Sequence, residues 1–175
     1  NPQCMTAAYK RAIQFCLTVL ISLSTLSGQN NSAAEAQEYF DHGNYGSAIV
    51  LLKDLLEKEP DNALLNYQAG VCYLHSRSLK HHAVEYFQKA IQFSPSWKTK
   101  SRPGPQEAPL DAHKLLGDAY TYAYNFEPAI QAYEKYKELA GEKETDQKLL
   151  AEVELRLDLC RHLKHYVPSQ SFPIS

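Results

Sequence analysis

The stretch that decides the fold is residues 110–141, LDAHKLLGDAYTYAYNFEPAIQAYEKYKELAG. Apolar side chains recur in it at helical spacing, in two stripes separated by the short segment 124–127. The stripes consist of Leu115, Leu116, Ala119 and Tyr120, and then of Ala129, Ile130, Tyr133 and Tyr136. Because residues three and four positions apart share one face of a helix, the stretch predicts two helices joined by a tight turn.

The same pattern occurs twice more upstream. Counted from Ala48, Ala83 and Ala129, a leucine or aromatic residue follows at +4, an apolar residue at +7 and proline or glycine at +12. The predicted units are residues 33–62, 63–95 and 110–141, and Pro60 and Pro95, which close the first two, are 35 residues apart. An internal period of this length is typical of stacked helical hairpins.

Small residues in each unit predict close helix packing. Gly70 and Gly117 on the first helices, and Ala48, Ala83 and Ala129 on the second helices, leave room for the two helices of a hairpin to approach each other. Proline after the second helix ends it, because proline cannot donate the next backbone hydrogen bond.

The connections between the predicted helices differ. The first turn contains Gly43 and Asn44, a pair that favours the left-handed conformation at a helix end. The second turn is one residue longer than the third. Residues 96–109 hold three prolines and a glycine, and they are predicted to form an insert loop that bulges from the stack.

One more helix is predicted over residues 145–167. Its apolar positions follow a three-four spacing from Leu149 to Cys160. Tyr136, at the end of the third unit, stands where a small residue is expected if an identical unit followed. We therefore expect residues 145–167 to cap the stack.

The two ends of the chain show export and linker patterns. Residues 1–28 are interpreted as a few upstream residues followed from Met5 by a secretory signal peptide, since Lys10 and Arg11 precede the 15-residue apolar stretch 12–26. An uncleaved membrane anchor is the alternative, although a spanning helix needs about 20 apolar residues. Residues 168–175 are predicted to be a linker to a further domain, and the protein is expected to be exported, periplasmic or associated with an outer membrane.

The composition and motifs indicate no chemistry. The net charge is −2, which argues against nucleic-acid binding. Neither a phosphate-binding glycine loop nor a nucleophile motif occurs, and the His81-His82 pair is interpreted as solvated imidazoles. We expect no catalytic residue, metal or cofactor. Cys72 and Cys160 are interpreted as buried free thiols, with a disulfide as the alternative.

The three units resemble the tetratricopeptide repeat over residues 33–141. That resemblance implies an all-α fold, a right-handed superhelix of antiparallel helix pairs with about three repeats and a capping helix. Over residues 29–167 the chain also resembles the N-terminal repeat region of exported envelope proteins that carry β-propeller and OmpA-type domains, some of which serve type IX secretion and gliding. The resemblance implies a protein-binding scaffold of the cell envelope, and a stand-alone periplasmic peptide-binding chaperone is the alternative.

In tetratricopeptide repeat proteins the first helices line a concave groove, and this implies where partners bind. The candidate binding residues on the first helices are Gln37, Asp41, Gln68, His75, Asp111, Lys114, Asp118 and Tyr122. Aromatic and polar side chains together suit an extended peptide or a partner helix of another envelope protein. Basic groups are missing at the positions where some repeat proteins clamp a peptide carboxylate, so that mode is disfavoured. Membrane contact is expected only through the leader or through partners.

Overall fold

The computed structural model describes residues 32–94, 106–141 and 147–166. These residues form helices and turns, and no strand occurs among them. Residues 32–41 are helical, and the helices that follow are α2 (Tyr45–Lys58), α3 (Ala63–Leu74), the 3₁₀ helix η1 (Lys80–His82), α4 (Ala83–Gln92), α6 (Asp111–Tyr122), α7 (Phe126–Ala140) and α8 (Gln147–Leu163).

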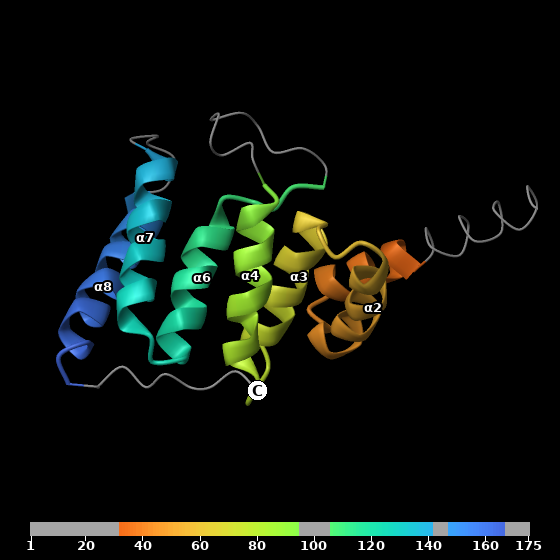
Figure 1. Cartoon of the computed structure of the whole chain (residues 1–175), viewed down its shortest axis with the longest axis horizontal. Helices are drawn as coiled ribbons and strands as arrows, with labels where there is room; N and C mark the ends of the chain where they lie inside the picture. The colour runs from red at the N-terminus through yellow and green to blue at the C-terminus, as the bar shows by residue number, and fades with distance from the viewer. Residues whose placement is uncertain (1–31, 95–105, 142–146, 167–175) are drawn as a thin grey trace, which may run out of the picture.

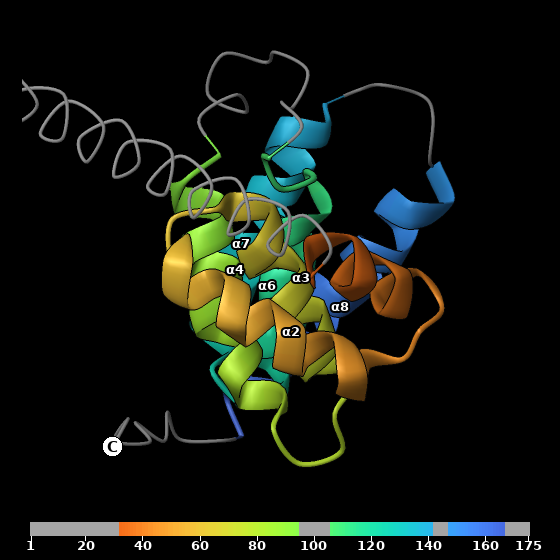
Figure 2. The same cartoon turned by 90° about the vertical axis from the view of Figure 1, so that its right-hand side faces the viewer.

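The helices stack in chain order from α2 to α8 (Figure 1). Each helix packs on the next one: α2 on α3, α3 on α4, α4 on α6, α6 on α7, and α7 on α8. Figure 2, turned by a quarter, shows α2 in front of the helices that follow it. The predicted fold class, an all-α stack of antiparallel helix pairs, is confirmed.

Glycines set the distance between the two helices of a pair. A Cβ atom added to Gly70 would lie 2.8 Å from the ring of Phe87, and one added to Gly117 would lie 2.5 Å from the ring of Tyr133. Both distances are shorter than carbon atoms tolerate, so the aromatic ring on the second helix occupies the space that a side chain on the first would need. The close approach predicted for these glycines is confirmed.

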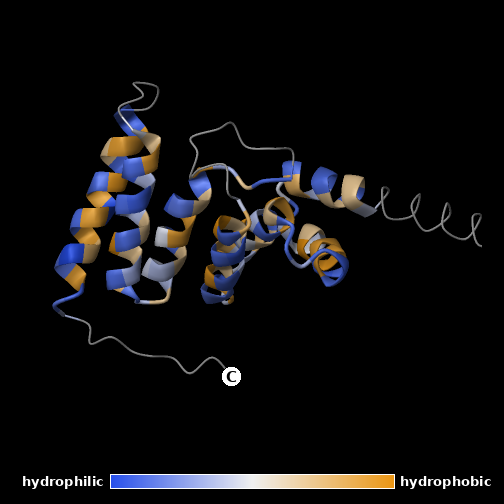
Figure 3. Ribbon diagram, turned by 45° about the horizontal axis from the view of Figure 1, so that its top comes forward, coloured by the Kyte–Doolittle hydropathy of each residue, from blue (hydrophilic) through white to orange (hydrophobic). Residues whose placement is uncertain are grey.

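The core consists of three clusters along the stack. Ala48, Leu52 and Leu55 bury the first pair together with Ala36 and Cys72. Ala83, Phe87 and Ala90 form the centre of the second pair with alanines of α6. The third cluster joins α7 to α8 through Ala129, Tyr133, Tyr136, Val153, Leu157 and Cys160. Figure 3 shows the resulting apolar and polar stripes along the same helices. The packing of Tyr136 against α8 agrees with the capping role predicted from its size.

The turns inside the pairs follow from local backbone chemistry. Gly43 has φ of +72°, as expected for the left-handed position, and Asn44 caps α2 by accepting a hydrogen bond from the Ser47 amide. In the third pair Tyr124 has the equivalent place, with φ of +59°. In the second pair η1 lies directly before α4, in the longer of the two turns.

The end of the insert 96–109 packs against the stack instead of bulging from it. The Leu64 amide donates to the carbonyl of Gln106 (2.9 Å), and the Ala108 amide donates to the hydroxyl of Ser94 (2.9 Å). Ala108 is fully buried in the second cluster. The prediction of a bulging loop was wrong for residues 106–109, because Ser94 supplies a hydrogen-bond partner at the end of α4.

Several predictions concern residues outside the described ranges. Pro95, the signal peptide of residues 1–28, the linker of residues 168–175 and most of the insert belong to this group. Pro60 lies exposed in the turn between α2 and α3. Among the described residues, no helix is both long enough and apolar enough to cross a bilayer.

Candidate partner-binding surface

The candidate residues lie on the helix 32–41, α3 and α6, the first helices of the three pairs. Side-chain interactions connect these helices in order: Gln37 to Gln68, Asp111 to Tyr67, and then Asp118 to Arg156 on α8. We call the surface formed by these three helices and α8 the first-helix face. These interactions link the first helices of neighbouring pairs to each other and to α8.

At one end of this face, two glutamines connect neighbouring pairs. The Gln68 amide nitrogen donates to Oε1 of Gln37 (2.5 Å), and the Gln37 amide nitrogen donates to Oδ1 of Asp41 (2.8 Å). Gln68 is only 4% exposed, whereas Gln37 and Asp41 are exposed. The prediction that Gln68 offers a free amide to a partner is therefore corrected: its side chain joins the first pair to the second.

At the other end, Asp118 belongs to a buried network. Its carboxylate accepts a hydrogen bond from the Tyr133 hydroxyl (2.6 Å) and forms an ion pair with Arg156. Asp118 is 8% exposed. Burial, with the charge of Asp118 added to it, raises the pKa of Tyr133, so the hydroxyl remains protonated and donates. The prediction that Asp118 faces a partner is corrected in the same way, since its oxygens hold α7 and α8.

Between these two ends, α6 carries two charged residues, Asp111 and Lys114. Both are half-buried, and neither forms an ion pair or side-chain hydrogen bond with another described residue. Tyr67 of α3 lies near Asp111. Its pKa is raised to about 12, mainly by burial and then by the charge of Asp111. Lys114 also adds to the lowering of the Glu152 pKa, which is due mainly to Arg156. The carboxylate of Asp111 thus lies near a protonated phenol.

Aromatic side chains mark the end of this face that lies near the turns. The ring of His75 stacks on Tyr45, with 4.2 Å between the ring centroids. Tyr122 is 54% exposed, and the ammonium of Lys80 lies 4.2 Å from the centre of its ring. Exposed aromatic rings supply contact area at low entropic cost. Tyr45 and Lys80 were not among the predicted site residues. They contact two residues that were, His75 and Tyr122.

The described chain offers no group of three His, Cys, Asp or Glu side chains that could hold a metal ion. Cys72 and Cys160 are buried free thiols, as interpreted from their helical positions. Burial raises the pKa of Cys72 to about 12, so this thiol is a poor nucleophile at neutral pH.

Two buried polar side chains of the first helices were not foreseen: Asn66 (1% exposed) and His113 (7% exposed). Each precedes the glycine of its unit by four residues, namely Gly70 and Gly117. The shared spacing could have predicted their burial. A residue four positions before the glycine lies on the same face of the helix as the glycine, and that face packs against the second helix.

Residues 33–96 match the family model of the tetratricopeptide repeat. Among solved structures, the translocator chaperone SycD of Yersinia enterocolitica is similar with a TM-score of 0.61 at 12% identity, and the match covers 78% of this chain and 85% of that one. The TPR2B domain of yeast Sti1, solved as a complex with pHsp70, has a TM-score of 0.58 at 13% identity and covers 78% of this chain and 98% of that one.

A third similar structure is the MamA protein, with a TM-score of 0.58 at 18% identity. The match covers 77% of this chain but only 62% of MamA, so the chain spans less than two thirds of that protein. A comparison with curated protein sequences finds no match. At these identities the structures show a shared fold, a stack of helical hairpins.

Proposed function

We propose that this chain is a non-enzymatic scaffold that binds a protein partner on its first-helix face. Residues 33–96 match the family model of the tetratricopeptide repeat, and the solved structures similar to the chain share its fold. The solved neighbours support protein binding as a class: one is a complex of a repeat domain with pHsp70, and another is a secretion chaperone. The ligand proposed here is an extended segment or a helix of another protein.

The observation that carries this proposal is the two charged residues of α6, Asp111 and Lys114. Both are half-buried, and neither forms an ion pair or a side-chain hydrogen bond with another described residue. A half-buried charge that forms no ion pair is stabilised when an opposite charge or a hydrogen-bonding group binds next to it. A peptide backbone, which presents both N–H and C=O groups, satisfies such a pair and can cover the exposed ring of Tyr122.

We further propose that this scaffold works in the cell envelope. The support is the signal-peptide pattern of residues 1–28 and the resemblance of residues 29–167 to the repeat region of exported envelope proteins. On this proposal the repeats hold an envelope partner, with a role in a type IX secretion complex as its most specific form.

A photo-crosslinking experiment tests the binding face. The full chain, produced in its own host, carries benzoylphenylalanine in place of Tyr122, and a second version carries it in place of Val50, an exposed residue of α2. We expect a discrete protein adduct from position 122 in the envelope fraction and none from position 50. Adding Lys114→Glu should abolish the adduct, whereas Lys58→Glu on α2 should leave it intact.

The same experiment separates a scaffold from the alternative, a stand-alone periplasmic chaperone. A scaffold gives one adduct of defined mass, whereas a chaperone gives a ladder of adducts with many unfolded substrates. Equal adducts from positions 122 and 50, or an adduct that survives Lys114→Glu, would contradict the proposed binding face.

A further inference from the structure

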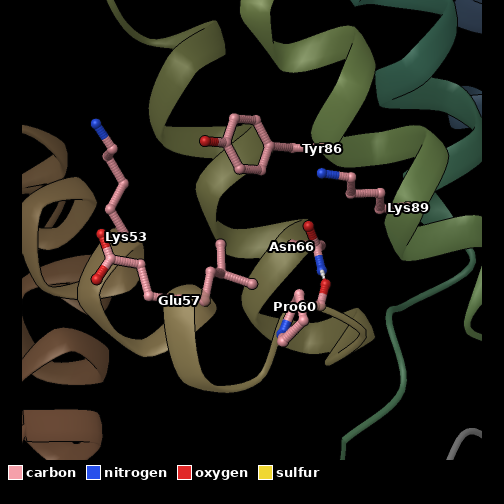
Figure 4. Close-up of a pocket in the computed structure, with 7 residues that line it drawn as sticks. Lys53, Glu57, Pro60, Asn66, Tyr86 and Lys89 are labelled. Atoms are coloured by element: carbon pink, nitrogen blue, oxygen red, sulfur yellow. Dashed lines mark hydrogen bonds between the residues drawn. The ribbon is translucent and has the colours of Figure 1, made fainter.

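A pocket of about 190 Å³ lies on the second helices, away from the first-helix face. Its walls come from α2, α4 and the turn after α2, and Asn66 of α3 forms its buried end (Figure 4). Lys53, Glu57, Tyr86 and Lys89 surround it with polar groups, while Leu56 and Pro60 supply carbon surface. We call it the second-helix pocket, and the repeat pattern assigns it no role.

The side chain of Asn66 has one possible orientation. Its amide nitrogen donates to the carbonyl oxygens of Pro60 (2.8 Å) and Asn62 (2.9 Å). Since both partners are acceptors, the nitrogen must face them and the oxygen must face the other way. Figure 4 shows this oxygen on the side away from Pro60. Among the described residues no donor reaches it, and the side chain is 1% exposed.

The two hydrogen bonds of the Asn66 amide nitrogen fix the direction of its oxygen. The pocket therefore has one rigid acceptor that favours an incoming N–H group.

Donors lie across the same space. The Lys89 ammonium gives one hydrogen bond to Glu85 (2.7 Å), so two of its three N–H groups remain. Burial, and then the neighbouring Tyr73, to which it is hydrogen-bonded, raises the pKa of Tyr86 to about 12. In Figure 4 the Lys89 ammonium lies on the same side of Asn66 as the amide oxygen, whereas the Tyr86 hydroxyl points away from both. A bound group with an acceptor atom can reach the Lys89 ammonium while its N–H meets Asn66.

The charges around the pocket balance. Lys53 and Lys89 are positive, while Glu57 and Glu85 are negative. A carboxylate could not donate to the Asn66 oxygen and would face Glu57. An ammonium could not accept from Lys89 and would be repelled by it. A neutral group with a donor on one side and an acceptor on the other fits both sets of atoms.

We propose that the second-helix pocket binds a primary carboxamide, the head group of an asparagine or glutamine side chain presented by a protein partner. The N–H of the carboxamide donates to Asn66, and its oxygen accepts from Lys89. Butyramide has the same heavy atoms as a glutamine side chain counted from its Cα atom, and it therefore serves as the probe of this pocket. Leu56 and Pro60 cover its methylene groups.

The repeat pattern does not impose this site. Asn66 lies four residues before Gly70, and the residue at the same position before Gly117 in the third unit is His113. His113 is larger than asparagine and lies near Lys135 and Glu138. Lys135 is also the counterpart of Lys89, since each lies six residues after the alanine of its second helix, Ala129 and Ala83. The third unit thus provides a matched control within the same molecule.

The test is an NMR titration of the full chain with four probes of similar size: butyramide, butyrate, butylammonium and N-methylpropanamide. We expect saturable shifts of the Asn66 side-chain amide with butyramide, at least about fivefold tighter than with the other three, the difference that one hydrogen bond makes. Equal binding of butyrate or butylammonium would overturn the neutral ligand. Equal binding of N-methylpropanamide would overturn the primary carboxamide in favour of a backbone amide.

Variants locate the binding. Lys89→Met should weaken butyramide binding about fivefold by removing one charged donor, whereas Lys135→Met should not change it. Asn66→Ala should abolish the binding. If that variant does not fold, the comparison of Lys89→Met with Lys135→Met still decides. Unchanged binding in Lys89→Met, or no saturable shift with wild-type protein, would refute the proposal.

Discussion

At the scale of single residues, the distance between the two helices of a pair depends on a glycine, which has only a hydrogen atom as its side chain. Gly117 and Gly70 carry a hydrogen where any other residue would place a Cβ against an aromatic ring. The rings of Tyr133 and Phe87 are almost fully buried and cannot move without opening the core.

This packing makes a prediction about one substitution at two positions. Gly117→Ala should lower the free energy of unfolding by about 2–3 kcal/mol, because overpacking forces the ring or the helix to shift. Gly46→Ala, on α2 with nothing within 4 Å of the added Cβ, should be neutral or stabilise by about 0.5 kcal/mol through helix propensity. Urea unfolding followed by circular dichroism measures both, and similar effects at the two positions would contradict the packing argument.

A second residue-scale prediction concerns His113. Burial, and then the positive charge of Lys135, lowers its pKa to about 4, while Glu138 opposes the shift. The unfolded chain binds the proton near pH 6.5. The folded state disfavours that proton, so the stabilisation is fully present above about pH 6.5 and is lost as the pH falls toward 4.

Between pH 7.5 and pH 5 the wild type should lose about 2 kcal/mol more of its unfolding free energy than His113→Gln. Urea titrations at the two pH values measure this difference. Parallel losses in both proteins would show that His113 does not carry the effect.

The residue scale also shows what the sequence could foresee. The role of Gly70 and Gly117 followed from their spacing to Ala83 and Ala129 alone, because a hairpin needs small residues where its helices cross. The burial of His113 did not follow, because its neighbours Lys135 and Glu138 lie on another helix.

At the scale of secondary-structure elements, the attachment of α8 is the feature that depends on polar chemistry. Besides its apolar contacts with α7, this helix contributes Arg156, which binds Asp118 of α6 and Glu152 of its own helix. Cys160 of α8 also contacts the hydroxyl of Thr121 at 3.3 Å. The helix α8 therefore packs against both helices of the third pair, α6 and α7.

Replacing Arg156 should loosen this helix. Arg156→Met leaves the buried carboxylate of Asp118 without its cation and should cost about 1–2 kcal/mol, a value reduced for the part of Arg156 that is exposed. Arg161→Met, on the same helix, breaks only exposed ion pairs with Glu134, Glu154 and Asp158 and should therefore cost much less than Arg156→Met.

Hydrogen exchange of α8 amides, with urea unfolding, reads out both variants. Adding Asp118→Asn to Arg156→Met should recover part of the loss, since the buried charge is removed. No recovery would contradict the ion-pair explanation.

Apolar periodicity predicted the helices but not the path of the insert. The helices of each pair were predicted from their apolar spacing, and a capping helix was expected where α8 lies. The end of the insert was predicted incorrectly, because the hydrogen bond from Ala108 to Ser94 joins positions 14 residues apart that no local pattern relates.

At the scale of the whole molecule, the two proposals concern separate surfaces of the stack. The charged residues Asp111 and Lys114 belong to the first helices, whereas Asn66 faces a pocket between second helices. We expect the two surfaces to act independently. Lys114→Glu should abolish the adduct at position 122 without changing butyramide affinity, and Lys89→Met should do the reverse. A variant that impairs both would show that the faces are coupled through the stack.

The sequence by itself determined that this protein is a stack of helical hairpins, because helix formation, close approach and helix ends depend on residues within one unit. It also pointed to the first helices as a binding face. Which side chains remain available there was decided by the tertiary structure: Gln68 and Asp118 are taken by Gln37 and Arg156, from other units. The pocket was decided in the same way, because Lys53 and Lys89 border one space only after α2 and α4 have packed around Asn66.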